Sequence, residues 1–256
     1  MKTLLAVWLL FGISLSLRSQ ESDAYFNRMN PLIRGHEAEA ALAGEYFRLG
    51  NKKLGERNFE EAVQDFTRAI TLNPSFSEAY NNRGIALRNL MDREGALLDF
   101  DKAVSLNPNY EEAYNNRGNV RLDMGDNEGA AADYTRALEI DPWLPDAYNN
   151  RGLARKNMRD LSGAEDDFSK AIRLSRQFAD AYVNRGLVRS EQGSYAAAIA
   201  DFDKAIRYAR DYSDAYLGRG LAKIRAGFQI EGCDDLKKAS SLGNLNAQAA
   251  LVQHCP

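Results

Sequence analysis

Residues 114–147 read YNNRGNVRLDMGDNEGAAADYTRALEIDPWLPDA, and this stretch is the best guide to the fold because the chain repeats it. Within the stretch, apolar residues follow a helical spacing that is interrupted at Met124-Gly125-Asp126 and ends at Asp141-Pro142. Each block is therefore predicted to form a helix, a turn and a second helix. Similar blocks begin every 34 residues, at Tyr46, Tyr80, Tyr114, Tyr148, Tyr182 and Tyr216.

Small and bulky residues occupy fixed columns of the repeat. A glycine stands four residues after each tyrosine, at Gly50, Gly84, Gly118, Gly152, Gly186 and Gly220. A bulky column holds Phe66, Phe100, Tyr134, Phe168, Phe202 and Leu236. Alanine predominates four residues before and three residues after the bulky column. Large side chains of one helix are therefore expected to pack over small residues of its partner.

This combination of an aromatic residue, Gly, Ala, Phe or Tyr, Ala and Pro at fixed spacing resembles the tetratricopeptide repeat family over residues 46–249. The resemblance implies an all-α solenoid of six helix-turn-helix repeats with a C-terminal capping helix at 246–256. Residues 20–45 are expected to form a lead-in that is helical from about His36. The six repeats are 46–79, 80–113, 114–147, 148–181, 182–215 and 216–249.

Two columns of the repeat are charged. The first departs from the family pattern, and the second recurs in every repeat. Arginine replaces the usual leucine at Arg83, Arg117, Arg151, Arg185 and Arg219. An aspartate recurs at Asp65, Asp99, Asp133, Asp167, Asp201 and Asp235. A buried guanidinium needs a counter-ion, so structural ion pairs that fix the register of the repeats are predicted.

The partners of these ion pairs follow from the first repeat, which has Leu49 in place of the arginine. We expect each aspartate to pair with the arginine of the following repeat, because pairing within a repeat would leave Asp65 alone. Pairing within a repeat is the alternative. The expected pairs are Asp65 with Arg83, Asp99 with Arg117, Asp133 with Arg151, Asp167 with Arg185 and Asp201 with Arg219.

A candidate binding surface follows from the resemblance, because the first helices of this family line a concave face. The column two residues after each tyrosine points into that face and holds Asn82, Asn116, Asn150 and Asn184, followed by Gly218. Three residues further on stand Ile85, Asn119, Leu153 and Leu187. An asparagine amide both donates and accepts, so this ladder is predicted to bind the backbone of an extended peptide, centred on repeats two to five. The alternative is a ladder inherited with the family and never occupied.

Acidic residues stand near the start of the first helices, and their expected role is to complement the helix dipole. They are Glu78, Glu112, Asp146, Asp180 and Asp214. The basic positions of the family's carboxylate clamp hold Phe47, Glu112 and Asn116 here, so that binding mode is not expected.

The N-terminal residues predict export. Lys2 precedes an apolar run from Leu4 to Leu17, and Arg18 follows it, which is typical of a signal peptide over residues 1–19. The run is shorter than the roughly 20 residues that span a bilayer, although an uncleaved anchor is the alternative. The periplasm is the favoured location, because the chain resembles exported bacterial repeat proteins, with secretion or signal anchoring as the other outcomes.

The two cysteines are predicted to form a disulfide, because helices carrying Cys233 and Cys255 should run antiparallel at the C-terminal end. At ~1.5 Å per residue from their shared turn, their heights differ by ~3 Å. Two free thiols are the alternative.

Composition and motifs argue against several classes of function. The 33 basic and 36 acidic residues are spread evenly, so no nucleic-acid partner is expected. The histidines are His36 and His254, and no catalytic set, metal site, cofactor or small-molecule motif is predicted. The predicted function is a non-enzymatic scaffold that binds a protein or peptide partner. The alternative is a structural subunit or assembly factor that packs through its edges or forms oligomers.

Overall fold

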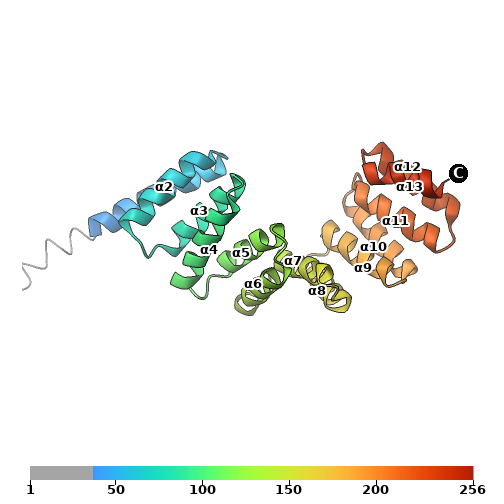
Figure 1. Cartoon of the computed structure of the whole chain (residues 1–256), viewed down its shortest axis with the longest axis horizontal. Helices are drawn as coiled ribbons and strands as arrows, with labels where there is room; N and C mark the ends of the chain where they lie inside the picture. Colours follow the sequence, from blue (N-terminus) through green and yellow to red (C-terminus); the bar gives the residue numbers. More distant parts are fainter. Residues whose placement is uncertain (1–36, 256) are drawn as a thin grey trace, which may run out of the picture. The chain divides into compact units, whose positions relative to one another are not determined.

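The computed structural model describes residues 37–255. These residues fall into two units, which divide after Asp92 into residues 37–92 and 93–255. The predicted signal peptide and residues 20–36 of the lead-in lie outside the described range. Unit 1 contains the helical residues 37–55, α2 (Phe59–Leu72) and α3 (Ser77–Asn89) (Figure 1). Unit 2 contains α4 (Arg93–Leu106), α5 (Glu111–Asp123), α6 (Asn127–Ile140), α7 (Pro145–Asn157), α8 (Leu161–Leu174), α9 (Ala179–Glu191), α10 (Tyr195–Tyr208), α11 (Ser213–Arg225), α12 (Gln229–Ser241) and α13 (Leu245–His254). The predicted all-α repeat fold is confirmed.

Each hairpin closes where the glycine of its first helix meets the bulky residue of its second. A methyl group on Gly118 of α5 would lie 2.9 Å from the ring of Tyr134 on α6, closer than real contacts allow. A methyl group on Gly152 of α7 would lie 2.7 Å from the ring of Phe168 on α8. Both aromatic residues have no exposed surface. The glycine column is thus explained by close helix packing rather than by a turn.

Successive hairpins of unit 2 stack through their first helices. Helix α5 contacts α7, α7 contacts α9, α9 contacts α11, and α11 contacts α13. The successive second helices α4, α6, α8, α10 and α12 make no such contacts with one another. Because the first helices are closer together, they lie on the inner side of the curve of unit 2. We call the surface formed by α5, α7, α9 and α11 the first-helix face.

The last helix, α13, occupies the position of a next first helix and ends the stack. The structure joins Cys233, near the start of α12, to Cys255, directly after α13, with 5.8 Å between their Cα atoms. The side chain of Asn244 caps α13 by accepting from the backbone N–H of Ala247 at 3.1 Å. A covalent bond and a capped start therefore hold this helix on repeat six. Within residues 37–255, no helix has both the length and the apolar character needed to cross a membrane.

Candidate functional site

The ladder asparagines Asn150 and Asn184 lie on first helices of unit 2, where their amides bind other asparagines of the same and the preceding first helix. Asn150 on α7 donates from Nδ2 to Oδ1 of Asn119 on α5 at 3.0 Å. Asn149 donates to Oδ1 of Asn150 at 3.2 Å, and Asn184 on α9 donates to Oδ1 of Asn149 at 3.0 Å. The hydroxyl of Tyr134 also donates to Asn119, at 2.8 Å. A continuous chain of amides therefore links α5, α7 and α9, and part of the predicted peptide-binding capacity is used inside the protein.

Unit 1 repeats this arrangement. Asn82 on α3 donates to Oδ1 of Asn51 at 2.7 Å, and Asn51 holds the same column in repeat one as Asn119 does in repeat three. Ile85, also on α3, is half-buried. An asparagine five residues after the tyrosine thus pairs with the ladder asparagine of the next repeat. The column five residues after the tyrosine holds asparagine in repeats one and three and leucine or isoleucine in the others. The sequence therefore contains a sign of this pairing, although the pattern alone favours a ligand-binding interpretation.

The arginine column forms buried ion pairs within each repeat of unit 2, not forward into the next. Arg117 binds Asp133 through two parallel bonds, from Nε at 2.9 Å and Nη2 at 2.6 Å. Arg121 adds a third bond to the same carboxylate at 2.7 Å. The same geometry joins Arg151 to Asp167, Arg185 to Asp201 and Arg219 to Asp235. The predicted forward pairing is therefore wrong, because the planar guanidinium of each first helix faces the carboxylate of its own second helix.

A second contact of each arginine still reaches the neighbouring repeat. The Nη1 atom of Arg151 donates to the hydroxyl of Thr135 on α6 at 3.1 Å. Arg117 reaches Asp101 on α4 at 2.7 Å, and Arg219 reaches Asp203 on α10 at 2.6 Å. The contact between neighbouring repeats is thus made by the residue that stands two positions after each aspartate of the column. In unit 1, where Leu49 replaces the arginine, Lys53 and Arg68 pair with Asp65, and Arg83 reaches Thr67.

These contacts leave the arginines charged. Burial lowers the pKa of Arg117, but hydrogen bonds and charges from Asp133 and Asp101 outweigh burial and hold that pKa above its usual value. The balance is the same for Arg219, with Asp235 and Asp203. Each guanidinium also lies over the tyrosine of its own repeat, at 5.3 Å for Arg117 over Tyr114. The column is therefore a structural network of charge pairs and cation–π contacts.

One hollow on the first-helix face lies between the starts of α5 and α7. Its volume is about 190 Å³, and its lining includes Glu112, Asn115, Asn116 and Asp146. The buried Oδ1 atom of Asn115 has no hydrogen-bond partner among the described residues. This hollow therefore offers carboxylates and a free carbonyl oxygen, which suit a donor or a cation.

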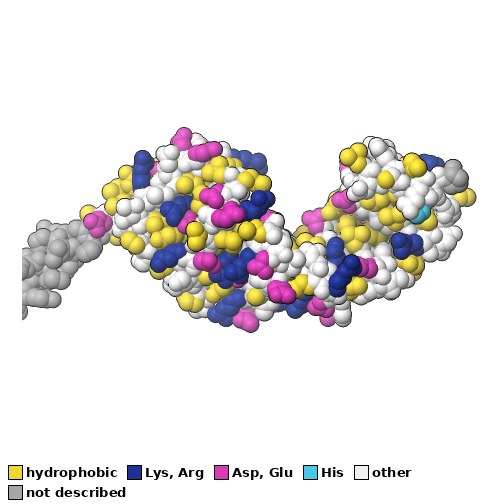
Figure 2. All heavy atoms as spheres, viewed as in Figure 1, with side chains coloured by type: hydrophobic (Ala, Val, Ile, Leu, Met, Phe, Trp, Pro, Cys, Tyr) yellow, Lys and Arg dark blue, Asp and Glu magenta, His cyan; other side chains and the backbone are white. Residues whose placement is uncertain are grey.

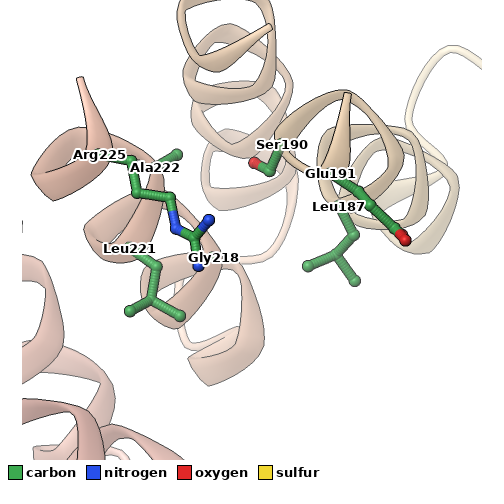
Figure 3. Close-up of a pocket in the computed structure, with 7 residues that line it drawn as sticks. All are labelled: Leu187, Ser190, Glu191, Gly218, Leu221, Ala222 and Arg225. Carbon is green, nitrogen blue, oxygen red and sulfur yellow. The ribbon is translucent and has the colours of Figure 1, made fainter. Parts of the chain in front are cut away.

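A larger hollow, of about 300 Å³, lies between α9 and α11. Figure 3 shows Leu187, Ser190 and Glu191 on one wall, facing Leu221 and Arg225 on the other. The ladder position here is Gly218, which has no side chain to extend toward α9. The buried Oγ atom of Ser190 has no hydrogen-bond partner in the described part of the chain. The larger hollow therefore lies between repeats five and six, at the edge of the predicted binding region.

Two of the acidic residues at the helix starts have partners in the next repeat. Asp180 accepts a hydrogen bond from the hydroxyl of Tyr212 at 2.5 Å. Asp214 accepts one from Nδ2 of Asn244 at 2.7 Å. Burial and the bond to Asp180 together raise the pKa of Tyr212 well above its usual value. These carboxylates therefore connect repeats in addition to complementing the helix dipole.

Among residues 37–255, no cluster of three or more His, Cys, Asp or Glu side chains is arranged to hold a metal ion. Figure 2 shows basic and acidic side chains interspersed on the visible face of the molecule, without a large area of one sign. This distribution offers no extended basic surface on that face for a phosphate backbone.

The class of protein that these helices and this face define is an α-solenoid built from helical hairpins. Three family models match the chain. Two are described as tetratricopeptide repeat models and match residues 77–110 and residues 45–76, 145–178 and 179–212, and one is described as a TPR repeat model and matches residues 118–158. The chain belongs to the tetratricopeptide repeat family.

Solved structures of the same fold support this assignment, whereas no curated protein matches the chain. The crystal structure of MamA is 28% identical with a TM-score of 0.59 and covers 64% of this chain and 96% of its own. YrrB, described as a TPR protein with an unusual peptide-binding site, is 22% identical with a TM-score of 0.62, covering 72% and 96%. PilF of Pseudomonas aeruginosa is 18% identical with a TM-score of 0.73, covering 84% and 99%.

Proposed function

We propose that this protein is a non-enzymatic interaction scaffold that binds an extended segment of a partner protein along the first-helix face of unit 2. The observation that carries the proposal is the pair of hollows on that face, each lined by a residue whose buried polar atom has no hydrogen-bond partner among residues 37–255. Buried polar atoms are almost always hydrogen-bonded in proteins. Both atoms are themselves buried, so Asn115 and Ser190 would each turn toward its hollow to gain a partner from a bound backbone or side chain.

The amide chain keeps the face in a form suited to such a ligand. An asparagine amide offers four hydrogen-bonding positions, and the contacts between α5, α7 and α9 use half of those of Asn150. The amides are therefore held in place while part of their capacity remains for a ligand. A preorganised surface costs less entropy on binding than a mobile one.

The two hollows differ in charge, which gives a bound segment a direction. Glu112 and Asp146 line the hollow between α5 and α7, whereas Arg225 and Glu191 line the hollow between α9 and α11, where Glu191 is paired with Arg159. A segment with a basic residue near repeats three and four and an acidic residue near repeats five and six is complementary. YrrB is described as having an unusual peptide-binding site on this fold. In the present chain, the two hollows of the first-helix face support peptide binding.

Photo-crosslinking in cells tests this proposal, because it captures a partner whose identity is not yet established. A photoreactive phenylalanine analogue replaces Glu112, in the first turn of α5, or Glu128, in the first turn of α6 of the same hairpin. Both positions are exposed. We expect a discrete crosslinked partner from position 112 and none from position 128. A partner captured equally at both positions, or only at 128, would reject binding on the first-helix face.

A second function is favoured by the exposed apolar side chains of α13. Leu245 is 76% exposed and Val252 is 89% exposed, and their spacing of seven residues places them on one side of this helix. The end of the stack thus suits packing against another subunit, as in a structural or assembly role. If this role holds, replacing Val252 with Asp will lower the mass of the assembly measured by light scattering, and crosslinking at position 112 will give no partner.

We further propose that the protein works outside the cytosol. The apolar run from Leu4 to Leu17 supports export, and the paired cysteines suit an oxidising compartment such as the periplasm. Secretion and a signal anchor are the other forms of this proposal. Fractionation of cells that express the full chain, followed by N-terminal sequencing of the protein, tests it. A protein that stays in the cytosol with Met1 or Lys2 at its N-terminus would contradict export.

A further inference from the structure

The hollow between α9 and α11 lies where the ladder is interrupted. In repeats four and five the ladder side chains bridge adjacent first helices, as Asn184 does between α9 and α7. Gly218 occupies this position in α11 and lines the hollow without a side chain that could bridge to α9. A methyl group added there would lie 2.5 Å from the ring of Phe202, which is completely buried. The local packing therefore excludes a ladder side chain without rearrangement, and the hollow is a built feature of repeats five and six.

The hollow carries one uncompensated positive charge. Arg225 is exposed at the end of α11 and makes no ion pair or hydrogen bond among residues 37–255. The nearest basic residues of the same helix, Arg219 and Lys223, are both bound to Asp235. The carboxylate that faces the hollow from α9, Glu191, is paired with Arg159 of the preceding repeat. The hollow therefore favours an anion.

The remaining lining is apolar with one polar group. Leu187 is 38% exposed, and Leu221 faces it from α11 (Figure 3). The buried hydroxyl of Ser190, which has no partner among the described residues, completes the wall on the α9 side. An aliphatic side chain between the two leucines would remove apolar surface from water, and rotation of the Ser190 hydroxyl into the hollow would let it bind a backbone group of the same ligand.

We propose that this hollow anchors the partner segment through a large aliphatic side chain followed directly by an internal Asp or Glu. The aliphatic group enters between Leu187 and Leu221, and the carboxylate binds Arg225. Charge complementarity selects this occupant over a wholly apolar or a basic one. This inference rests on the proposed function and adds the class of sequence that the face selects.

A titration with defined peptides tests the proposal on the full chain. The probe is a blocked hexapeptide, acetyl-Gly-Ser-Leu-Glu-Ser-Gly-amide. Its relatives replace Glu with Gln, replace Leu with Ala, or end in a free carboxylate after Leu. Binding is followed by backbone amide NMR shifts. We expect the Leu-Glu probe to shift the amides of residues 187–191 and 218–225 and to bind about threefold more tightly than the Gln form. The Ala form should bind about tenfold more weakly.

Substitutions on the protein assign these differences to named contacts. Arg225→Gln should remove the preference for Glu over Gln and leave the affinity for the Gln probe unchanged. Its matched control is Arg173→Gln, which removes an exposed arginine from the last turn of the second helix α8. Leu187→Ser should weaken all Leu probes, whereas Leu98→Ser, on the exposed side of α4, should not. Far-UV circular dichroism checks that each variant is folded.

Several results would overturn the inference. They are an absence of shifts around the hollow at millimolar probe, equal binding of the Glu and Gln probes, equal binding of the Leu and Ala probes, and tighter binding of the probe with a free carboxylate. Failure here remains distinct from failure of the proposed function, because crosslinking at position 112 reports on the other hollow. A partner crosslinked at 112 together with no peptide binding at the α9–α11 hollow would reject the anchor and retain the scaffold.

Discussion

Repeats three and four differ from the C-terminal end of the same stack in how they are held to their neighbours. In residues 114–181, Asn150 binds the preceding first helix, and Arg117 and Arg151 each contact the second helix of the preceding repeat. In residues 216–255 Arg219 keeps the same contact with Asp203, but the ladder amide is absent at Gly218, and the cap is held by a disulfide and by Asn244.

The contrast indicates where the repeat is constrained and where it is open to change. An interior repeat has a neighbour on both sides, so its polar side chains are used to bind those neighbours. The last repeat meets a short cap, α13, and a covalent bond substitutes for the missing contacts. The larger hollow of the first-helix face lies where the amide chain has ended. The ladder column can thus either bind the neighbouring first helix, as Asn150 does, or leave the face free for a ligand, as at Gly218.

The largest expected effect is the loss of an interior aspartate. Asp167→Ala leaves Arg151 and Arg155 largely buried without their carboxylate, so we expect a loss of about 3 to 4 kcal/mol in the free energy of unfolding. Asp235→Ala at the end of the stack should cost about half as much, because Arg219 keeps Asp203. Urea unfolding followed by circular dichroism measures both.

A matched variant separates the charge from the geometry of this network. Replacing Arg151 and Arg155 with Met together with Asp167→Leu removes all three charges at once, and such replacements are often nearly neutral in stability. A loss below about 1 kcal/mol for Asp167→Ala, or an equal loss at Asp235, would contradict the role of the second carboxylate, Asp203, in holding Arg219.

The next effect concerns the disulfide, which closes a loop with a sequence separation of 22. Replacing Cys233 and Cys255 with Ser should remove about 3 kcal/mol of stability from the end of the stack. Because repeats contact only their neighbours, the loss should stay local. Hydrogen exchange should accelerate over residues 229–254 and remain unchanged over residues 114–174. Uniform acceleration along unit 2 would show that the cap supports the whole stack.

The sequence predicted the fold well because its strongest constraint is local and repeated. Gly118 and Tyr134 must stand opposite each other for two helices to touch, and any repeat that broke this column would lose its hairpin. The pairing of Cys233 with Cys255 follows the same geometry of adjacent antiparallel helices, and the structure has that pairing.

The choice of ion-pair partner could not be read in the same way. Arg117 has an aspartate 16 residues ahead and another 18 residues behind, and the repeat spacing alone permits either. The orientation of the guanidinium decides, because its two parallel bonds fit Asp133 on the facing helix of the same hairpin. The hollow beside Gly218 was equally hidden, because the ring of Phe202 packs against the backbone of Gly218 and the pattern of residues does not show what space remains around it.

A smaller effect tests whether the ladder is structural in the interior. Asn150→Ala removes the bond to Asn119 and the acceptor for Asn149, so we expect a loss of about 1 kcal/mol. Asn246→Ala is the matched control at the C-terminal end, because Asn246 is exposed on α13 and should be neutral within a few tenths of a kcal/mol. Equal stability of the two variants would mean that the amide chain contributes nothing and that the ladder is free for a ligand.

The smallest effect concerns the hydroxyl of Tyr212, whose equivalent in repeat three is Leu144. Tyr212→Phe removes the bond to Asp180 and should cost about 0.5 to 1 kcal/mol at neutral pH. The pKa of Tyr212 is raised in the folded protein, whereas an exposed tyrosine in the unfolded chain ionises near 10.0. Below that pH both states keep the proton, and the full contribution is present.

As the pH rises through 10 toward the raised pKa, the unfolded chain releases this proton first and the contribution is lost. The wild-type protein should therefore lose its advantage over Tyr212→Phe above pH 10, in melting experiments that compare the two proteins at each pH. Leu144→Ala, which removes apolar packing at the equivalent interior position, should show a difference that does not vary with pH. A pH-independent difference for Tyr212→Phe as well would mean that the hydroxyl contributes no titrating contact between repeats four and five.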